Sequence, residues 1–148
     1  MNISEYLSGI RHLFLDTAPV IYYVEAHPLY LPKIEKLFEY IDKGLVTAVT
    51  SPITLSECLI LPYRLNSPEF AEKFSRLIIS GNNTLFMPID DSMAKQSAKL
   101  RVRYNLSLTD AMQFAVALAA ECDAFLTNDI ALKRVQELKI LVIDEIVS

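Results

Sequence analysis

The sequence predicts an α/β protein, a three-layer α/β/α sandwich with a central parallel sheet of four to five strands. Short apolar runs alternate with longer stretches of helical periodicity, which is typical of repeated strand-helix units. The short runs are almost continuously apolar, as strands are when helices cover both faces of a parallel sheet. With 148 residues, of which 52% are hydrophobic and 22% charged, the chain is expected to form one domain, residues 1–148.

Five segments are predicted to be strands. In chain order they are HLFLD at 12–16, LVTAVTS at 45–51, TLFMPI at 84–89, AFLTN at 124–128 and KILVID at 139–144. Helical periodicity predicts seven helices, at about residues 18–26, 29–43, 52–64, 68–80, 92–104, 107–121 and 130–137. Pro19, Pro52 and Pro68 fit these starts, because a first-turn proline gives up no helical hydrogen bond. The helix at 107–121 is apolar on nearly every face, which predicts a central, buried position.

Several classes of function are disfavoured by what the sequence lacks. Three glycines in the whole chain leave no G-x-G-x-x-G, no Walker loop and no nucleophile elbow. Cys58 and Cys122 are isolated, which argues against a zinc site or a disulfide. No long uncharged apolar run and no signal-peptide pattern occur, so a soluble, cytoplasmic protein without a membrane segment is expected. The net charge of −4 requires that an anionic substrate be held by a local patch or by a metal.

Four acidic residues are expected at one end of the sheet, where ligands of open parallel sheets bind. Asp16 ends the first strand, Asp129 follows the fourth, Glu57 lies one to two turns into the helix after the second, and Asp110 lies near the start of the apolar helix. Carboxylates so close repel one another, and no lysine or arginine neighbours them in the sequence. A divalent cation would resolve this conflict, and oxygen ligands of this kind suit Mg²⁺ or Mn²⁺.

Helix capping is the alternative explanation for most of these acids. Glu57 is the exception, because it lies inside a helix among apolar residues, where a carboxylate needs a partner. The capping assignments are Asp16 with Thr17, Ser107 with Asp110, and either Asn128 or Asp129 for the helix at 130, with Asn128 the better candidate. The case for a metal site therefore depends on the four acids together.

The combined pattern resembles a PIN domain, the nuclease fold of VapC-type toxins and many RNA-processing enzymes. The matching motifs are the hydrophobic-Asp-Thr at Asp16, the Ser-Glu at Glu57, the Asp-Ala-x-x-x-Ala at Asp110 and the Thr-Asn-Asp at Asp129. They occur in the family's order and at about its spacing, and the resemblance spans essentially the whole chain.

The resemblance implies a metal-dependent site with Mg²⁺ or Mn²⁺ as cofactor. Asp16, Glu57, Asp110 and Asp129 would be its catalytic residues and metal ligands, while Thr127 and Asn128 would support it. It further implies an endoribonuclease that hydrolyses RNA phosphodiester bonds, with the metal offsetting charge on the phosphate.

Two features depart from the family's pattern. Gln113 stands where many relatives have a histidine after Asp-Ala, which changes hydrogen bonding near the site but removes no carboxylate. The acidic total charge is less typical of a protein that grips RNA broadly. Lys95, Lys99 and Arg103 recur at helical spacing and are candidates for RNA binding, with a merely solvated helix face as the equally plausible alternative.

Two functions from different classes follow. The first is an RNA-cleaving toxin with an antitoxin protein as partner, and a homodimer is also expected. The second is a catalytically inactive PIN-like module that binds or assembles with a partner. The presence of all four acids favours the first.

Overall fold

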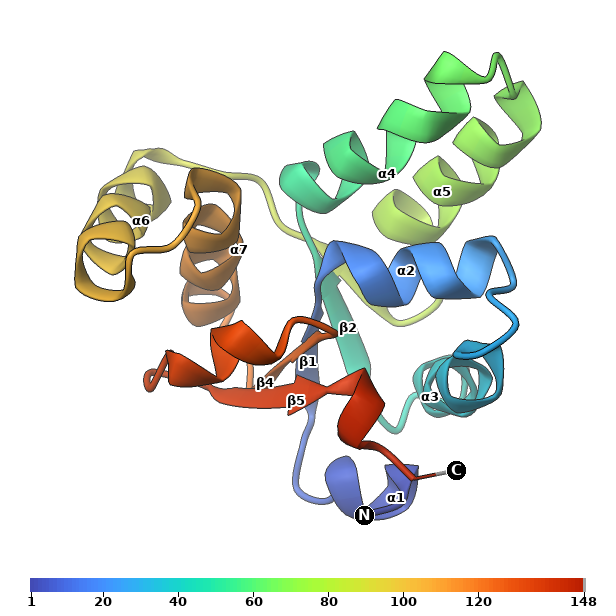
Figure 1. Cartoon of the computed structure of the whole chain (residues 1–148), viewed down its shortest axis with the longest axis horizontal. Helices are drawn as coiled ribbons and strands as arrows, with labels where there is room; N and C mark the ends of the chain where they lie inside the picture. The colour runs from blue at the N-terminus through green and yellow to red at the C-terminus, as the bar shows by residue number, and fades with distance from the viewer. Residues whose placement is uncertain (148) are drawn as a thin grey trace.

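The computed structural model describes residues 1–147 and contains a single five-stranded, fully parallel sheet with the strand order β3-β2-β1-β4-β5 (Figure 1). The strands are β1 (His12–Leu15), β2 (Thr47–Thr50), β3 (Thr84–Phe86), β4 (Ala124–Thr127) and β5 (Lys139–Val142). Each lies within a predicted strand segment, and the α/β class with a central parallel sheet is confirmed. The single domain of residues 1–148 remains a prediction, and Ser148 lies outside the described residues.

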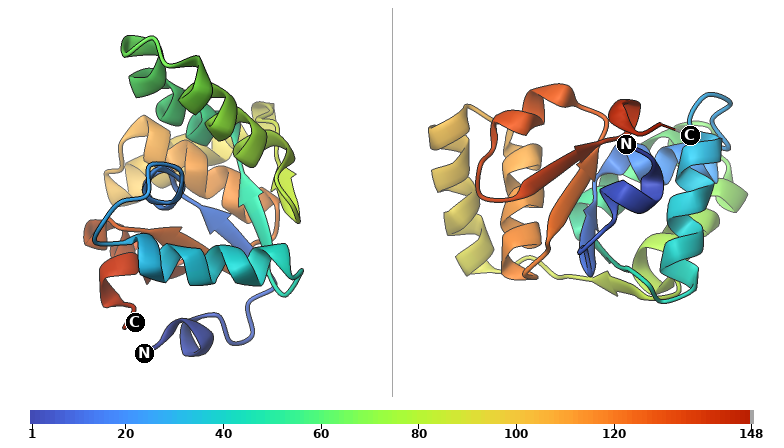
Figure 2. Two further views of the ribbon diagram at one scale, coloured as in Figure 1. Left: turned by 90° about the vertical axis from the view of Figure 1, so that its right-hand side faces the viewer. Right: turned by 90° about the horizontal axis from the view of Figure 1, so that it is seen from below.

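Helices cover both faces of this sheet, as two further views make clear (Figure 2). The α-helices are α1 (Ile3–Tyr6), α2 (Thr17–Val24), α3 (Leu31–Asp42), α4 (Pro52–Arg64), α5 (Pro68–Ser80), α6 (Asp91–Tyr104) and α7 (Leu108–Ala119). Two short 3₁₀ helices follow, η1 (Ile130–Arg134) and η2 (Ile143–Glu145). The α4–α5 hairpin extends outward from the rest of the fold (Figure 1).

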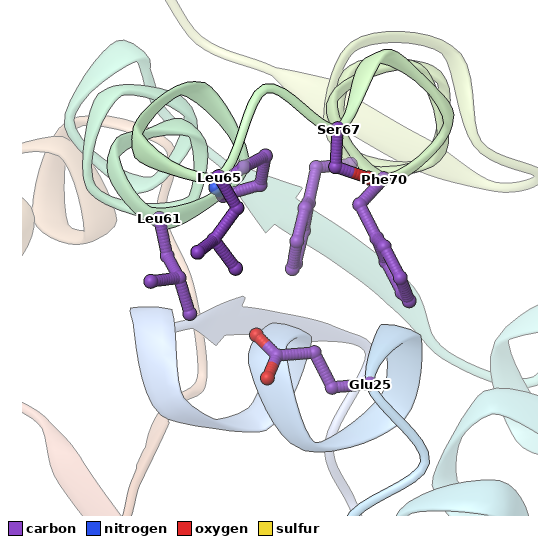
Figure 3. A pocket seen from close by; sticks show the side chains of 7 residues that line it. Glu25, Leu61, Leu65, Ser67 and Phe70 are labelled. Carbon is purple, nitrogen blue, oxygen red and sulfur yellow. The ribbon is translucent and has the colours of Figure 1, made fainter.

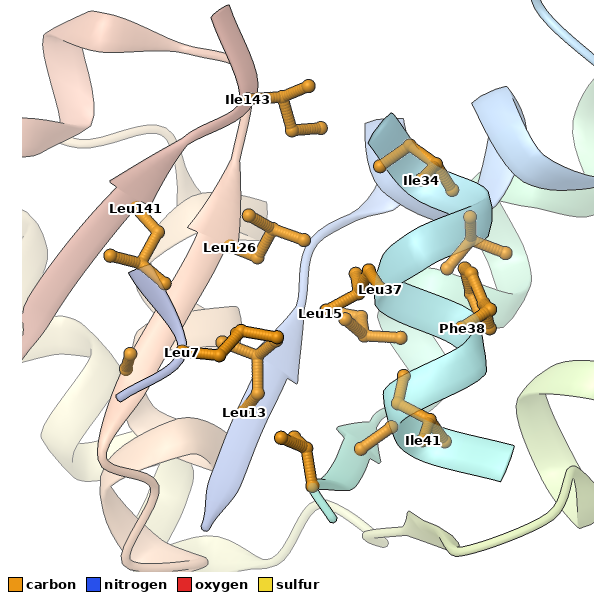
Figure 4. Close-up of a cluster of buried hydrophobic side chains, with 14 of the residues drawn as sticks. Leu7, Leu13, Leu15, Ile34, Leu37, Phe38, Ile41, Leu126, Leu141 and Ile143 are labelled. Carbon is orange, nitrogen blue, oxygen red and sulfur yellow. The ribbon is translucent and has the colours of Figure 1, made fainter. Parts of the chain in front are cut away.

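The core has two halves, because successive residues of each strand point to opposite faces of the sheet. On one face Leu13, Leu15 and Leu126 pack against buried residues of α3, including Leu37 and Ile41 (Figure 4). Each such side chain that is fully buried contributes roughly 1.5–3 kcal/mol of hydrophobic stabilisation. The amphipathic pattern of α3 therefore becomes the contact that holds it on the sheet.

Three phenylalanines organise the opposite half of the core. Phe125 of β4 stacks on Phe14 of β1, with ring centroids 5.0 Å apart, and on Phe114 of α7 at 4.1 Å. All three are completely buried. They fix α7 against the centre of the sheet, as its apolar sequence predicts.

Four helices end in the same C-terminal capping motif, although the chain has few glycines. Ala26, Asn66 and Glu121 take positive φ directly after the C-caps of α2, α4 and α7, and Gly44 does so after α3. In each case the next amide bonds back to the last turn, for example Cys122 to the carbonyl of Ala117 at 3.0 Å. This is the Schellman arrangement, which satisfies otherwise unpaired carbonyls.

One predicted helix was wrong in detail, and one short helix was not predicted. The helix predicted at 130–137 is a 3₁₀ helix that ends at Arg134, because Val135 is already extended. Leu132 and Val135, both buried, are three residues apart, which suits a 3₁₀ repeat. The short helix α1 was not predicted, since its one turn has too few residues to show a period.

The helices also bear on the membrane question. The longest in residues 1–147, α6, has 14 residues. None of the described helices combines the length and the apolar character needed to cross a bilayer.

Asp123 anchors the entry to β1, and replacing it by alanine is expected to destabilise the protein by up to about 1 kcal/mol at neutral pH, because water competes for the hydrogen bonds of this exposed carboxylate. Its Oδ2 accepts hydrogen bonds from the amides of Arg11 at 2.8 Å and His12 at 2.9 Å, and these bonds lower its pKa. The contribution is therefore present above the usual aspartate pKa and is lost as pH falls through the lowered folded value. Urea unfolding of both proteins at pH 7 and pH 2.5 measures this, and an equal stability gap at both pH values would contradict it.

Candidate active site

The site lies where the direction of strand addition changes. From β1 the chain continues to β2 on one side, whereas β4 pairs with the other side of β1. In open parallel sheets, ligands bind outside the carboxyl ends of the strands at such a point. Asp16 directly follows β1, and Asp129 comes two residues after β4.

Asp16 is held rigidly between β1, β4 and α2. Its amide bonds to the carbonyl of Leu126 at 3.0 Å, which continues the β1–β4 pairing. Its Oδ1 accepts from the Thr17 amide at 2.9 Å, so it is the N-cap of α2, and its Oδ2 accepts from Thr127 Oγ1 at 2.8 Å. Asp16 is thus both a helix cap and a fixed carboxylate at the centre of the sheet edge.

Glu57 is brought to Asp16 by a threonine. It lies inside α4, whose first turn directly follows β2, and its Oε1 accepts from Thr17 Oγ1 at 2.7 Å. Thr17 is thus joined by its amide to Asp16 and by its hydroxyl to Glu57. The partner that a mid-helix carboxylate needs is this hydroxyl, which lies 40 residues away in the chain and is therefore not marked by any local sequence pattern.

Asp129 and Asp110 lie at the same end of the sheet as Asp16 and Glu57, and we call these four residues the acidic edge. Asp129 is exposed and caps η1, because its Oδ1 accepts a 3.0 Å hydrogen bond from the Ala131 amide. The Asp129 amide donates to Thr127 Oγ1 at 3.1 Å. Thr127 therefore contacts both Asp16 and Asp129. Asp110 is in the first turn of α7, which the hydroxyl of Ser107 caps at 3.1 Å.

The four acids act on one another electrostatically. Burial raises the pKa of Asp16 to about 6, against hydrogen bonds that lower it, and the charges of Asp110 and Glu57 raise it further. Burial also raises the pKa of Asp110, and the nearby charge of Asp129 adds to that rise, whereas Arg134 opposes it. Burial and neighbouring negative charges therefore disfavour the ionised forms of Asp16 and Asp110, and a bound cation would stabilise them.

A divalent cation fits this donor set chemically. All four side chains offer hard oxygen atoms, and within residues 1–147 none of them forms a salt bridge. In the same range, no three acidic, histidine or cysteine side chains form a preformed metal cage. Mg²⁺ commonly binds through one or two carboxylates and retains waters, so it needs no such cage.

Thr127 and Asn128, the two predicted supporting residues, have different roles in the structure. Thr127 is fully buried and contacts two of the four acids, as described. Asn128 was interpreted as the better cap of the following helix, and this was wrong, because Asp129 occupies that position. Instead, Asn128 donates to Tyr22 Oη at 3.1 Å and accepts from the Asp144 amide at 3.0 Å, which joins α2 to η2.

The predicted RNA-binding residues Lys95, Lys99 and Arg103 lie along α6 and extend away from the acidic edge. Lys95 and Lys99 line a shallow groove with Ala119 and its neighbours, at the opposite end of α7 from Asp110. Arg103, nearer the acidic end, pairs with Glu137.

An apolar groove opens between the end of α2 and the α4–α5 hairpin. Figure 3 shows Leu61, Leu65 and Phe70 above the carboxylate of Glu25, and Pro62, Ser67 and Phe74 complete the lining. Leu61 is 46% and Leu65 67% exposed, which is unusual for two leucines on neighbouring turns. We call Leu61, Leu65 and Phe70 the hairpin surface. No sequence pattern indicated this surface, because its residues belong to ordinary helical patterns.

Comparison with known proteins places this geometry in context. The family model described as PIN domain matches residues 13–138. Similar solved structures include VapBC2 of Rickettsia felis bound to a promoter DNA fragment, at 20% identity, a TM-score of 0.65, and coverage of 88% of this chain and 98% of that one. They also include VapC20 of Mycobacterium tuberculosis, a toxin that cleaves the sarcin-ricin loop, at 18% identity, a TM-score of 0.67, and coverage of 86% and 98%. FitAcB of Neisseria gonorrhoeae has 16% identity, a TM-score of 0.68, and coverage of 90% and 99%. No curated protein matches the sequence.

Proposed function

Because the chain belongs to the PIN domain family of nucleases, we propose that it is a metal-dependent endoribonuclease that hydrolyses RNA phosphodiester bonds in the cytoplasm. The observation that carries the proposal is the acidic edge: Asp16, Glu57, Asp110 and Asp129 share one end of the sheet, and none of them forms a salt bridge within the described residues. An inactive scaffold would gain nothing from carboxylates whose charges repel one another and cost stability.

If the protein has the proposed function, the four carboxylates would hold Mg²⁺ or Mn²⁺. Asp16 is the central residue of this group. When bound, the metal supplies positive charge that offsets the growing negative charge of the phosphate and of the leaving oxygen. Thr127 and Thr17 fix the Asp16 and Glu57 oxygens by hydrogen bonds of 2.8 Å and 2.7 Å, so these ligands need little reorganisation. Lys95, Lys99 and Arg103 stay as proposed contacts to the RNA backbone.

The test is cleavage of a labelled RNA by the purified protein with Mn²⁺ or Mg²⁺, with excess chelator and Asp16→Asn as controls. Metal-dependent cleavage that the variant lacks supports the proposal. A wild type without cleavage that still binds a protein partner supports the alternative, a catalytically inactive binding or assembly module.

We further propose that the protein is the toxin of a toxin–antitoxin pair and that the antitoxin binds the hairpin surface. The similarity to VapBC and FitAcB structures supports a partner of this kind. An apolar segment with a basic residue would match the three exposed apolar side chains and the Glu25 carboxylate beneath them. A homodimer formed through the same surface is the competing occupant.

Leu65→Lys is expected to weaken antitoxin binding at least tenfold without changing RNA cleavage, because it places a charge at the centre of an apolar contact. The partner to test is the product of a small reading frame beside the gene, and calorimetry gives the affinity. Val102→Lys, at an even more exposed apolar residue on α6 (86% against 67% for Leu65), is the control and should bind normally. Unchanged antitoxin affinity, or a dimer in size-exclusion chromatography that dissociates in the variant, would contradict this location.

A further inference from the structure

Three buried polar side chains form a network directly beneath the acidic edge. Ser51, Thr54 and Gln113 are each at most 1% exposed, in contrast to the apolar residues that fill most of the core. Ser51 Oγ donates to Gln113 Oε1, and Gln113 Nε2 donates to Thr54 Oγ1 at 2.7 Å. Thr54 Oγ1 in turn donates to the carbonyl of Leu15 at 3.4 Å, a long bond.

This network joins three separate elements of the fold. Ser51 and Thr54 form the cap and first turn of α4, Gln113 belongs to α7, and Leu15 is the last residue of β1. Ser51 Oγ also accepts from the amides of Ile53 at 3.1 Å and Thr54 at 3.4 Å, so the cap of α4 is part of the network.

Each attachment point lies close in sequence to one carboxylate. Leu15 precedes Asp16, Thr54 lies three residues before Glu57 on α4, and Gln113 lies three residues after Asp110 on α7. Residues three apart in a helix lie on the same face. The network therefore connects the three backbone segments that carry Asp16, Glu57 and Asp110.

We propose that Gln113, through Ser51 and Thr54, is a positioning residue that sets the spacing of Asp16, Glu57 and Asp110 for a divalent metal. Gln113 can do this because its amide both accepts and donates, which satisfies one hydroxyl on each side. Hydrophobic residues would fill the same volume but would not fix α4 and α7 relative to each other by directional hydrogen bonds. The inference rests on the proposed function, since it concerns metal binding at that site.

The direct test is Mn²⁺ binding by calorimetry to the full chain carrying Gln113→Met, which keeps the length of the side chain but removes both hydrogen bonds. The Mn²⁺ dissociation constant is expected to rise about tenfold to a hundredfold, as for other residues that orient metal ligands. The Mn²⁺ concentration for half-maximal RNA cleavage should rise by the same factor, while cleavage at saturating Mn²⁺ stays near the wild-type rate.

Two controls separate positioning from general stability. Thr50→Val removes another buried hydrogen bond, the 2.7 Å bond from Thr50 Oγ1 to the Ile78 carbonyl, which joins β2 to α5 and reaches no acid. It should lower the melting temperature but leave the Mn²⁺ affinity unchanged. Thr54→Val should weaken Mn²⁺ binding as Gln113→Met does, and Thr54→Ser, which keeps the hydroxyl, should restore it. This second pair carries the test if Gln113→Met fails to fold.

The outcomes separate the positioning role of Gln113 from the proposed function. If the wild type binds Mn²⁺ and both Gln113→Met and Thr54→Val bind it equally well, the positioning role is wrong and the proposed function survives. If the wild type itself binds no divalent metal, both are wrong.

Discussion

Asp16→Asn is expected to reduce RNA cleavage at saturating Mn²⁺ by about a thousandfold, while the metal-free variant unfolds no more easily than the wild type. Charge stabilisation by a bound metal lowers a barrier by several kcal/mol, and each 1.36 kcal/mol is about tenfold in rate. Asparagine is nearly isosteric and keeps an oxygen for the 2.9 Å bond from the Thr17 amide, so the cap of α2 is preserved.

The stability half of this expectation follows from the raised pKa of Asp16. The rise from 3.8 to about 6 means that the folded state holds this proton more tightly than the unfolded state. The ionised Asp16 carboxylate therefore destabilises the folded state at neutral pH. The free energy of unfolding is highest below about pH 4, where Asp16 is protonated, and falls by at most about 3 kcal/mol as the pH rises to about 6. Asparagine carries no charge, so the variant should equal or exceed the wild type above pH 6, and the difference should disappear below pH 4.

Asp90→Asn is the matched control for both measurements. Asp90 also caps a helix, accepting from the Met93 amide at 2.9 Å, but it lies outside the proposed ligand set. It should retain cleavage. A metal-free Asp16→Asn protein that unfolds far more easily than the wild type at pH 7.5 would show that Asp16 is structural.

Adding Mn²⁺ or Mg²⁺ is expected to raise the melting temperature of the wild type by roughly 8 °C at pH 7.5. A ligand at about 100 times its dissociation constant stabilises the folded state by about 2.7 kcal/mol, and 1 kcal/mol corresponds to roughly 3 °C in a domain of this size. The measurement is thermal unfolding by circular dichroism across a metal titration, with NaCl at matched ionic strength as reference.

The metal-induced shift should also depend on pH. Below pH 6 the metal competes with a proton on Asp16, so its affinity should fall by about tenfold per pH unit and the shift at fixed metal should shrink. The shift should be absent in Asp16→Asn and complete in Asp90→Asn. An equal shift from NaCl, or a full shift in Asp16→Asn, would contradict a metal site at this residue.

The fold was largely predictable because its signals are local and repeated. Apolar runs mark all five strands, while Pro52 and Ser107 mark the starts of α4 and α7. The 3₁₀ helix η1 was misassigned because the residues after Asp129 have good helix propensity, while the need to begin β5 at Lys139 stops the helix early. Tertiary context here overrides propensity.

The acids of the candidate site were predictable for a topological reason, since the carboxyl ends of parallel strands share one edge. The contacts that hold them were not. Thr17 and Glu57 are 40 residues apart, and Gln113 and Thr54 are 59 apart. No periodicity connects such pairs, so the hydroxyl to Glu57 and the network of Gln113 became visible only in three dimensions.

The most direct test of the central claim is cleavage of one labelled RNA, side by side, by the wild type and Asp16→Asn, purified identically, with Mn²⁺ and with excess chelator. We predict cleavage by the wild type with Mn²⁺, none with chelator, and about a thousandfold less cleavage by the variant. Equal cleavage by both proteins, or cleavage that persists with chelator, would show that the acidic edge is not the catalytic site.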